Sequence, residues 1–321
     1  MTQRLASIDV VLPTYNRARL LPRCVETFRA ARKPPGIGIR LMIIDNNSDD
    51  ETRRIGAEFV ERYPDLVSYL FEPRQGRHHA LNAGITASRA DVIAFFDDDE
   101  TLDPSWLEVI AREFADPAID FIGGPYKPNW LAPAPAWLPS ETAGPVGVVD
   151  WGPQRRRYGS KTFRAQFMGG NCAFRRHVFE RVGLYSDRYM YGEDLEMFRR
   201  VIEAGFVGDY VPDLVIFHDI SARKLTRSYW RHWYYVEGRT DGKLARDGRH
   251  PFAGKEILGI PRWMFRGIPE TALRRVGFAL RRDGVQGFAA ECALLKMLGY
   301  LRGRLLTVPE RYFDRSGQRG T

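Results

Sequence analysis

Residues 92–99 read Val-Ile-Ala-Phe-Phe-Asp-Asp-Asp, and this stretch decides the fold of the chain. A short run of β-branched and aromatic residues before polar ones predicts a buried strand. Ligands of open α/β sheets bind beyond the carboxyl ends of such strands. Three adjacent carboxylates disfavour joint ionisation, and a divalent cation that shares oxygen ligands with a phosphate offsets this repulsion. Asp97, Asp98 and Asp99 therefore predict a site for a metal ion and a phosphate.

Helix capping is the alternative explanation for these acids. Asp103 followed by Pro104 has the pattern of an N-cap residue and a first helical residue. A helix needs one cap, and the three acids lie upstream of Asp103. The metal interpretation is therefore favoured over capping.

Residues 8–125 alternate strand and helix patterns with short connections. Such βαβ repetition predicts an α/β fold with a mostly parallel sheet, helices on both faces and right-handed crossovers. Polar residues follow three of the strands, and their shared sheet edge favours a nucleotide pocket. The expected strands are 8–12, 39–44, 67–71 and 92–96, and the polar groups are Thr14–Asn16, Asp45–Asn47 and Asp97–Asp99.

The pattern changes after the predicted sheet strands. Residues 127–163 are rich in Pro, Trp and Gly, which predicts a long loop without regular elements that serves as a lid or binding loop. Residues 167–174 are strand-like, with two glycines that allow close backbone approach. A short helix around Val178 is expected to end near Gly183.

Two further acids, Glu193 and Asp194, begin a predicted helix whose apolar face includes Leu195 and Phe198. The helix dipole alone stabilises carboxylates at this position. A carboxylate held there is also able to act as a general base toward an attacking hydroxyl. Farther along, the apolar residues 215–217 lead into His218, which is either a metal ligand or a core histidine.

The composition indicates a globular protein that is not held together by disulfides. The 321 residues are 44% apolar and 27% charged, which is typical of a globular protein. The three cysteines, Cys24, Cys172 and Cys292, are odd in number and far apart, which argues against a disulfide framework and for reducing surroundings. Residues 1–8 contain no long apolar run, so we expect no secretory signal and a cytoplasmic location.

Taken together, the motifs resemble the family 2 glycosyltransferases with a GT-A fold, over roughly residues 7–240. The set of motifs in chain order is more specific than any one of them. The motifs are Val11–Arg17, Ile43–Ser48, the 76–84 stretch with Asn82, Asp97-x-Asp99, Gly169–Arg175 and Gly192–Asp194.

The resemblance implies roles for individual residues. Pro13, Tyr15 and Asn16 would line the nucleoside pocket, Asp45 would recognise the base, and Arg77 would lie near the base or diphosphate, with Asp98 among the donor-binding residues. Asp97 would face the ribose and the metal. Asp99 would be the principal ligand of Mn²⁺ or Mg²⁺, joined by His218. Asp194 would be the inverting base, and Glu193 would help to bind the acceptor.

The implied reaction is transfer of a sugar from a nucleoside-diphosphate donor to a hydroxyl of a glycan or lipid-linked acceptor, with inversion. Asp45 and Tyr15 fit uridine, so a UDP-sugar is favoured. A catalytically silent scaffold of the same fold that is recruited to membranes is one alternative, but it has no need of Asp99 and Asp194. A nucleotidyltransferase is another, but it ordinarily has a glycine-rich, lysine-bearing phosphate loop, which residues 13–16 do not provide.

The C-terminal part differs in charge. Residues 222–321 contain 21 Lys and Arg against 9 Asp and Glu. We therefore expect a catalytic domain over 1–221, with an acceptor or lid loop at 127–165, and a basic helical extension over 222–321. Residues 225–235, 262–266 and 273–282 mix aromatic or apolar residues with arginines, which fits either an anionic membrane surface or, for 225–235, a packed core helix. No nucleic-acid-binding module is recognised.

Overall fold

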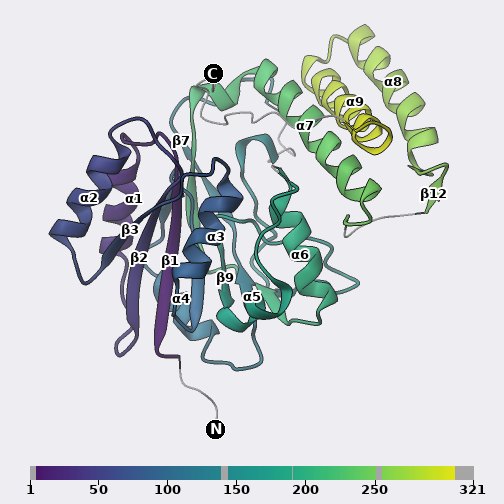
Figure 1. Cartoon of the computed structure of the whole chain (residues 1–321). Coiled ribbons are helices and arrows are strands. Elements are labelled where there is room, and N and C mark those ends of the chain that lie inside the picture. Colours follow the sequence, from purple (N-terminus) through teal and green to yellow (C-terminus); the bar gives the residue numbers. More distant parts are fainter. Residues whose placement is uncertain (1–4, 139–143, 190, 251–254, 308–321) are drawn as a thin grey trace. The chain divides into compact units, whose positions relative to one another are not determined.

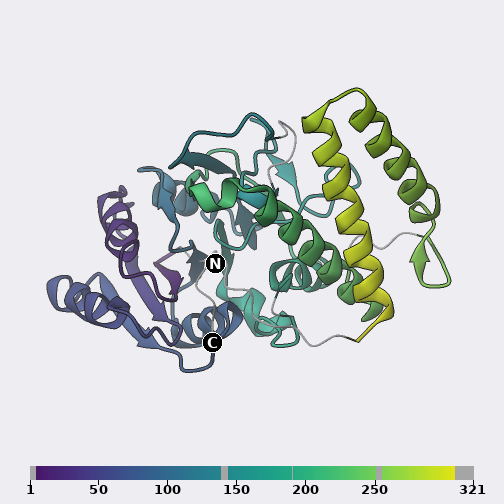
Figure 2. The same ribbon diagram turned by 90° about the horizontal axis from the view of Figure 1, so that it is seen from above.

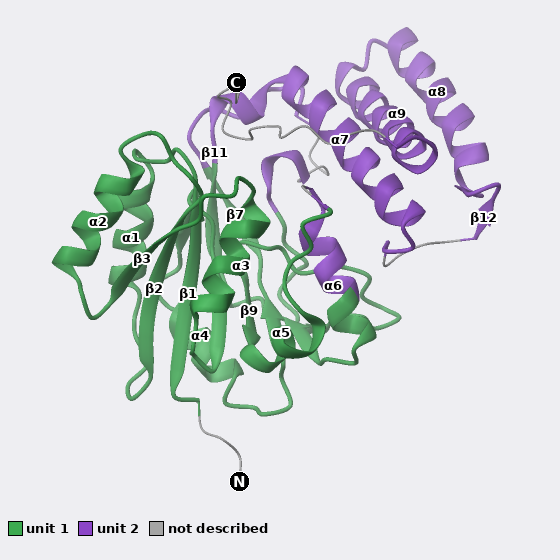
Figure 3. Ribbon diagram, viewed as in Figure 1, with its two compact units in different colours: residues 1–129, 149–188, 200–219 green, residues 130–148, 189–199, 220–321 purple. Residues whose placement is uncertain are grey.

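The computed structural model describes residues 5–138, 144–189, 191–250 and 255–307. The chain forms two compact units (Figure 3). The first contains residues 1–129, 149–188 and 200–219, and the second contains 130–148, 189–199 and 220–321. Within the described residues, no helix has both the length and the apolar character that crossing a bilayer requires.

The first unit is built on an eight-stranded sheet in the order β3-β2-β1-β4-β9-β6-β10-β8. Figure 1 labels its strands β3, β2, β1 and β9. The neighbours β3, β2, β1 and β4 are parallel, as the alternating pattern predicts, while β9 is antiparallel to both of its neighbours. The strands are β1 Ser7–Thr14, β2 Gly38–Asp45, β3 Val67–Phe71, β4 Val92–Phe95, β6 Phe121–Gly123, β8 Arg156–Arg157, β9 Cys172–Arg175 and β10 Gly208–Tyr210.

Helices cover both faces of this sheet, as expected. On one face, Phe28 of α1, Phe59 of α2 and Trp106 of α4 join a single apolar core with Val10 of β1. On the other face, α3 packs so closely that a Cβ at its Gly84 would lie 2.6 Å from the Val11 side chain. The helices are α1 Leu21–Ala30, α2 Thr52–Arg62, α3 Arg77–Ala87, α4 Trp106–Glu113 and α5 Arg176–Val182.

A second, three-stranded sheet has the order β5-β11-β7 and corrects two sequence expectations. The strands are β5 Glu100–Leu102, β11 Ile216–Ile220 and β7 Tyr126–Trp130. Residues 127–163 are therefore not entirely irregular, because β7 is an edge strand, where Pro128 is tolerated. The strand at 215–217 does not end before His218 but continues through it.

The start of α4 corrects a further expectation. The helix expected at Pro104 begins only at Trp106, because Asp103 instead accepts hydrogen bonds from Ser105.

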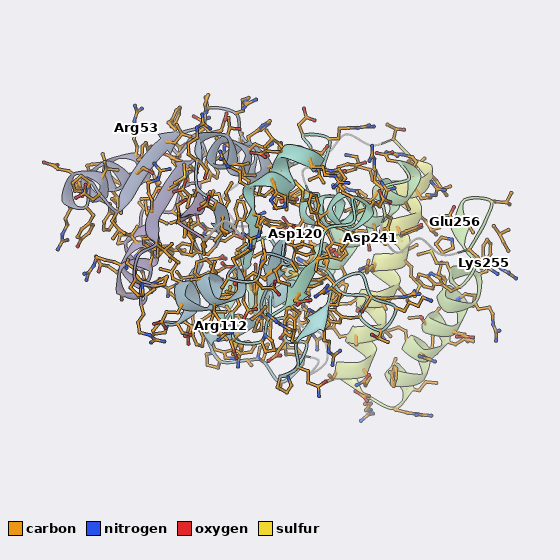
Figure 4. All side chains as sticks on the ribbon, turned by 90° about the horizontal axis from the view of Figure 1, so that it is seen from below. Arg53, Arg112, Asp120, Asp241, Lys255 and Glu256 are labelled. Carbon is orange, nitrogen blue, oxygen red and sulfur yellow. The ribbon has the colours of Figure 1, made fainter. Side chains whose placement is uncertain are left out.

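The second unit is mainly helical, and its helices α7, α8 and α9 are seen from above in Figure 2. In it, α7 and α9 pack along their length and α8 packs on α9. Asp241 of α7, labelled in Figure 4, lies 3.1 Å from Nζ of Lys296 on α9. The elements are η1 Gly144–Val146, α6 Glu193–Glu203 (whose last turn belongs to the first unit), η2 Ala222–Leu225, α7 Arg227–Arg246, β12 Glu256–Ile257, β13 Ile260–Pro261, α8 Met264–Leu280 and α9 Gly284–Leu305.

The aromatic and basic run at 225–235 is a packed helix. Trp230 is fully buried, and its ring lies edge-on to that of Trp137, 5.7 Å away. Tyr229 and Phe288 belong to the same apolar cluster. The sequence left open whether this run lies on a membrane surface or packs as a core helix. For Tyr229 and Trp230, the structure shows a core helix.

Candidate active site

Three parallel strands end at one edge of the large sheet. In the register of β1, Thr14 pairs with Asp45 of β2, and Val11 pairs with Phe95 of β4. The loops that leave these strands therefore begin side by side, although they are separated by tens of residues in the sequence. This edge collects the polar groups that the sequence placed at strand ends.

The loop after β1 is fastened to the loop after β2. Asn16 has a positive φ of 52°, and its backbone N–H donates to Oγ of Ser48 at 2.9 Å. In return, the backbone N–H of Asp49 donates to Oδ1 of Asn16 at 2.9 Å. Pro13 is buried in β1, and Tyr15 is half-buried. The residues expected around the nucleoside thus lie at the end of β1 and in the loop after it, which is hydrogen-bonded to the loop after β2.

Asp45 is fully buried behind these two loops. Its Oδ1 accepts from the backbone N–H of Ser48 at 3.0 Å, and its Oδ2 accepts from the hydroxyl of Tyr69 at 2.5 Å. Burial and this hydrogen bond raise the pKa of Tyr69, so the phenol stays a donor. Both oxygens of Asp45 therefore hold protein groups, and contact with a base would use their remaining lone pairs.

Asn46 fixes the next loop of the site, a role that the sequence did not reveal. Its Nδ2 donates to the backbone oxygen of Arg74 at 2.7 Å, and its Oδ1 accepts from the N–H of Gly76 at 2.8 Å. Arg77 follows as the first residue of α3. A buried amide that satisfies both sides of a loop holds it in one conformation. Asn46 therefore positions Arg77.

The first two acids after β4 each face an arginine. Nη2 of Arg77 lies 2.9 Å from Oδ1 of Asp97, and Nε of Arg17 lies 3.3 Å from Oδ1 of Asp98. Burial raises the pKa of Asp98 to about 7, against the attraction of Arg17 and with added repulsion from Asp99. The site thus holds two guanidinium groups beside its carboxylates, where a diphosphate would need positive charge.

Asp99 and His218 meet across the second sheet. β5 and β11 pair so that His218 lies opposite Glu100, and this brings Nε2 of His218 to 3.4 Å from Oδ2 of Asp99. One imidazole nitrogen and one carboxylate oxygen at this separation fit a shared Mn²⁺ or Mg²⁺ ion. Among the described residues, no cluster of three or more His, Cys, Asp or Glu is arranged to hold a metal. The remaining ligands would be donor phosphate oxygens and water.

Glu100 is the residue of this site that the sequence did not single out. It is 1% exposed, and its Oε2 accepts from the backbone N–H of Asp97 at 2.7 Å. Burial, together with Asp97 and Asp99, raises the pKa of Glu100. A Cβ at Gly170 would lie 2.5 Å from Oε1 of Glu100 and 2.8 Å from Oδ2 of Asp97. Gly170, which lies just before β9, therefore makes room for these carboxylates.

Glu193 and Asp194 lie in the second unit, in the first turn of α6. The preceding residue, Gly192, has a φ of 78°, and a Cβ there would lie 2.5 Å from the Thr240 side chain. Glu193 is buried, and Asp194 is half-buried. This turn therefore holds Asp194 at a helix N-terminus that packs against α7.

Comparison with known proteins identifies the class. Residues 9–183 match the family model described as glycosyl transferase family 2. The chain is 26% identical over 221 residues to glycosyltransferase AglE of Haloferax volcanii, which covers 68% of each chain. It is 28% identical over 182 residues to glucosyl-dolichyl phosphate glucuronosyltransferase of the same organism, covering 56% of this chain and 55% of the relative.

Among solved structures, the mannosyltransferase PcManGT of Pyrobaculum calidifontis, in complex with GDP-Man and Mn²⁺, superposes with a TM-score of 0.58. The sequence identity is 17%, and the match covers 92% of this chain and 88% of that one. This likeness confirms the expected GT-A fold. The protein belongs to glycosyl transferase family 2 and is a glycosyltransferase.

Proposed function

We propose that this protein transfers a sugar from a nucleoside-diphosphate donor to a hydroxyl group of a lipid-linked or glycan acceptor, with inversion at the anomeric carbon. The observation that carries this proposal is the edge where β1, β2 and β4 end, with Asp97, Asp98 and Asp99 facing Arg77, Arg17 and His218. A relative whose name includes glucosyl-dolichyl phosphate supports a lipid-linked acceptor.

The nucleoside and the diphosphate of the donor would each meet groups at this edge. The loop held by Asn16 and Ser48 would take the nucleoside, and Arg77 and Arg17 would face the diphosphate. Asp99 and His218 would hold the divalent metal. When bound, this ion stabilises the negative charge that forms on the leaving phosphate. No acidic group is then required to protonate the leaving group.

Asp194 would deprotonate the acceptor hydroxyl. Its carboxylate lies in the first turn of α6, and a carboxylate is able to accept a proton as a general base. A single displacement by the activated hydroxyl inverts the anomeric centre. Glu193, in the same turn, would bind other acceptor hydroxyls.

The donor is tested by binding and hydrolysis of UDP-, GDP- and dTDP-sugars with Mn²⁺, with Mg²⁺ and with EDTA. A guanosine donor is included because the Pyrobaculum structure contains GDP-Man. We expect one donor to bind only with metal, and Asp99→Ala to lose that binding. Asp65→Ala, at an exposed position of the first unit, is the matched control. Metal-independent binding, or wild-type binding by Asp99→Ala, would contradict the metal assignment.

The base is tested by Asp194→Asn, which keeps the size of the side chain and removes its basicity. We expect donor affinity to remain and turnover to fall about 10²–10⁴-fold, the usual contribution of a general base. Asp187→Asn, at an exposed position of the first unit, is the control. Wild-type turnover by Asp194→Asn would show that another group accepts the proton.

A further inference from the structure

Exposed large apolar side chains are concentrated in the C-terminal part of the second unit. Among the described residues, ten of the fifteen such side chains lie between residues 257 and 306. Monomeric proteins rarely expose apolar residues in such a concentration unless the surface binds something. The ten are Ile257, Leu258, Trp263, Phe265, Leu273, Val276, Leu280, Leu298, Leu305 and Leu306.

Helix α8 presents two different apolar faces. One face packs on α9, where a Cβ at Gly287 would lie 3.7 Å from the Cβ of Phe278. The other face carries Phe265, Leu273, Val276 and Leu280, whose spacing places them on one side of a helix. Leu273 is 72% exposed and Leu280 is 82% exposed. This second face therefore has no cover within the described chain.

The same segment is strongly basic. Residues 262–282 contain six arginines and one acid, Glu270. A helix with an exposed apolar stripe and arginines beside it is typical of a helix that lies in the plane of a membrane surface. Its guanidinium groups would meet anionic headgroups while its apolar side chains enter the acyl boundary.

A cavity of about 260 Å³ lies at the C-terminal end of α8, between α7 and the start of α9. Four arginines line it: Arg227, Arg231, Arg275 and Arg282. Phe288 supports two of them, because the guanidinium groups of Arg227 and Arg231 lie 5.2 and 5.5 Å from the centre of its ring.

The acids of this cavity are already engaged. Glu291 lies 2.6 Å from Nε of Arg231 and 3.8 Å from Nη2 of Arg275. Asp283 caps α9 by accepting from the N–H of Gln286 at 3.0 Å. The cavity therefore has an excess of guanidinium groups, which suits a phosphate. Its lining also includes Ala279, which is exposed on α8 between Val276 and Leu280.

We propose that α8 docks the protein on an anionic membrane, with Phe265, Leu273, Val276 and Leu280 in the acyl boundary and a lipid phosphate in the four-arginine cavity. This surface belongs entirely to the second unit and goes beyond the transfer reaction. A second copy of the chain fits the surface less well, because self-association would bring two arginine-rich helices together.

The test is co-sedimentation of the full chain with vesicles of phosphatidylcholine alone and of phosphatidylcholine with phosphatidylglycerol, at low salt. We expect binding to the anionic vesicles only. Leu273→Gln with Leu280→Gln should abolish it. Arg227→Gln with Arg282→Gln should weaken it about fivefold for each charge removed. Arg53→Gln with Arg89→Gln removes two charges from the first unit and should leave binding unchanged.

Four measurements keep the test decisive. Thermal unfolding and donor binding show that each variant is folded. If the wild type binds donor but not vesicles, the membrane-docking proposal is overturned and the proposed transfer function is not. Titration of inorganic phosphate identifies a site for soluble phosphate, and saturation without vesicle binding contradicts the proposal. Size-exclusion chromatography with light scattering identifies a dimer, and a dimer that the two-leucine variant dissociates, without vesicle binding, also contradicts it.

Discussion

Gly170 shows how a residue without a side chain shapes the acidic site. Any Cβ there would fall within 3 Å of oxygens of both Glu100 and Asp97. Glu100 is buried and holds the backbone of Asp97, so it has little room to move away. The glycine is therefore needed for the position of the carboxylates and not for an unusual backbone conformation.

We predict that Gly170→Ala lowers kcat/KM about tenfold to a hundredfold, because displacement of a substrate-positioning group by about 1 Å has effects of this size. The loss should be in donor affinity and turnover, with unfolding changed less. Gly38→Ala, where a Cβ would make only an ordinary contact of 3.6 Å, is the control. Steady-state kinetics of both variants would decide, and unchanged kinetics for Gly170→Ala would contradict the packing argument.

The sequence predicts the acids of the site but not their partners. Asp97–Asp99 stand out because they end an apolar run, and Asp194 because it begins a helix. Glu100 follows three acids and looks like one more exposed carboxylate in the sequence, whereas in the structure it is buried, with Gly170 close to its side chain. The side chain that each acid contacts is distant from it in the sequence, as Arg77 is from Asp97. No local sequence pattern therefore predicts these contacts.

At the scale of elements, four glycines let α7 and α9 touch through their backbones. A Cβ at Gly238 would lie 1.9 Å from the backbone oxygen of Lys296, and one at Gly242 would lie 2.1 Å from that of Tyr300. Gly299 and Gly303 of α9 meet the backbone oxygens of Tyr235 and Arg239 in the same way. Both helices therefore carry a pair of glycines four residues apart on the contact face.

We predict that Gly238→Ala destabilises the second unit by about 1–3 kcal/mol or more, the usual effect of overpacking against atoms that cannot yield. Gly277→Ala is the control, since a Cβ there meets nothing within 4 Å. That change should instead stabilise α8 by up to about 1 kcal/mol through helix propensity. Urea unfolding measures the change in the free energy of unfolding for each variant. Equal changes for Gly238→Ala and Gly277→Ala would contradict the close packing of α7 and α9.

The ion pair between α7 and α9 predicts an acid dependence of stability. Burial alone would raise the pKa of Asp241, but hydrogen bonding to His250 and the charge of Lys296 outweigh it, so this pKa is lowered from 3.8. Lys296 also lies 3.9 Å from Glu237, and the pKa of Lys296 is raised. The unfolded state therefore binds a proton at Asp241 more readily than the folded state. The stability that this ion pair contributes is present above about pH 4, the unfolded pKa, and is lost as pH falls through the lower pKa of Asp241 in the folded state.

We therefore expect Asp241→Asn to be less stable than the wild type at pH 7, and the difference to shrink below about pH 4. Unfolding by urea between pH 3 and pH 7 measures it. Asp65→Asn, at an exposed site, should show no such change. A difference that stays constant with pH would mean that Asp241 contributes through packing and not through its charge.

Elements with a continuous apolar pattern could be predicted from the sequence, and short edge elements could not. Each of the strands β1 to β4 contains at least three consecutive apolar residues, and the sequence placed all four. β5 has three residues, one of them Glu100, and β7 contains Pro128, so neither has a strand pattern of its own. Both form because β11 pairs between them, which is a contact between distant segments.

At the scale of the whole molecule, each unit has an apolar core of its own. The core of the first unit packs on the large sheet, and that of the second contains Trp230 and Phe288. Compact units with separate cores are able to unfold in separate steps. The proposed donor site lies in the first unit, and the glycine contact between α7 and α9 lies in the second. Perturbing one of them should therefore affect one unit only.

We predict two transitions in differential scanning calorimetry. Donor and Mn²⁺ at about a hundred times the dissociation constant should stabilise the first unit by about 2.7 kcal/mol and raise its transition by roughly 5–10 °C. EDTA or Asp99→Ala should abolish this shift, while Gly238→Ala should lower only the other transition. If the two perturbations instead moved one common transition, the units would unfold together, and the separation into independent cores would be wrong.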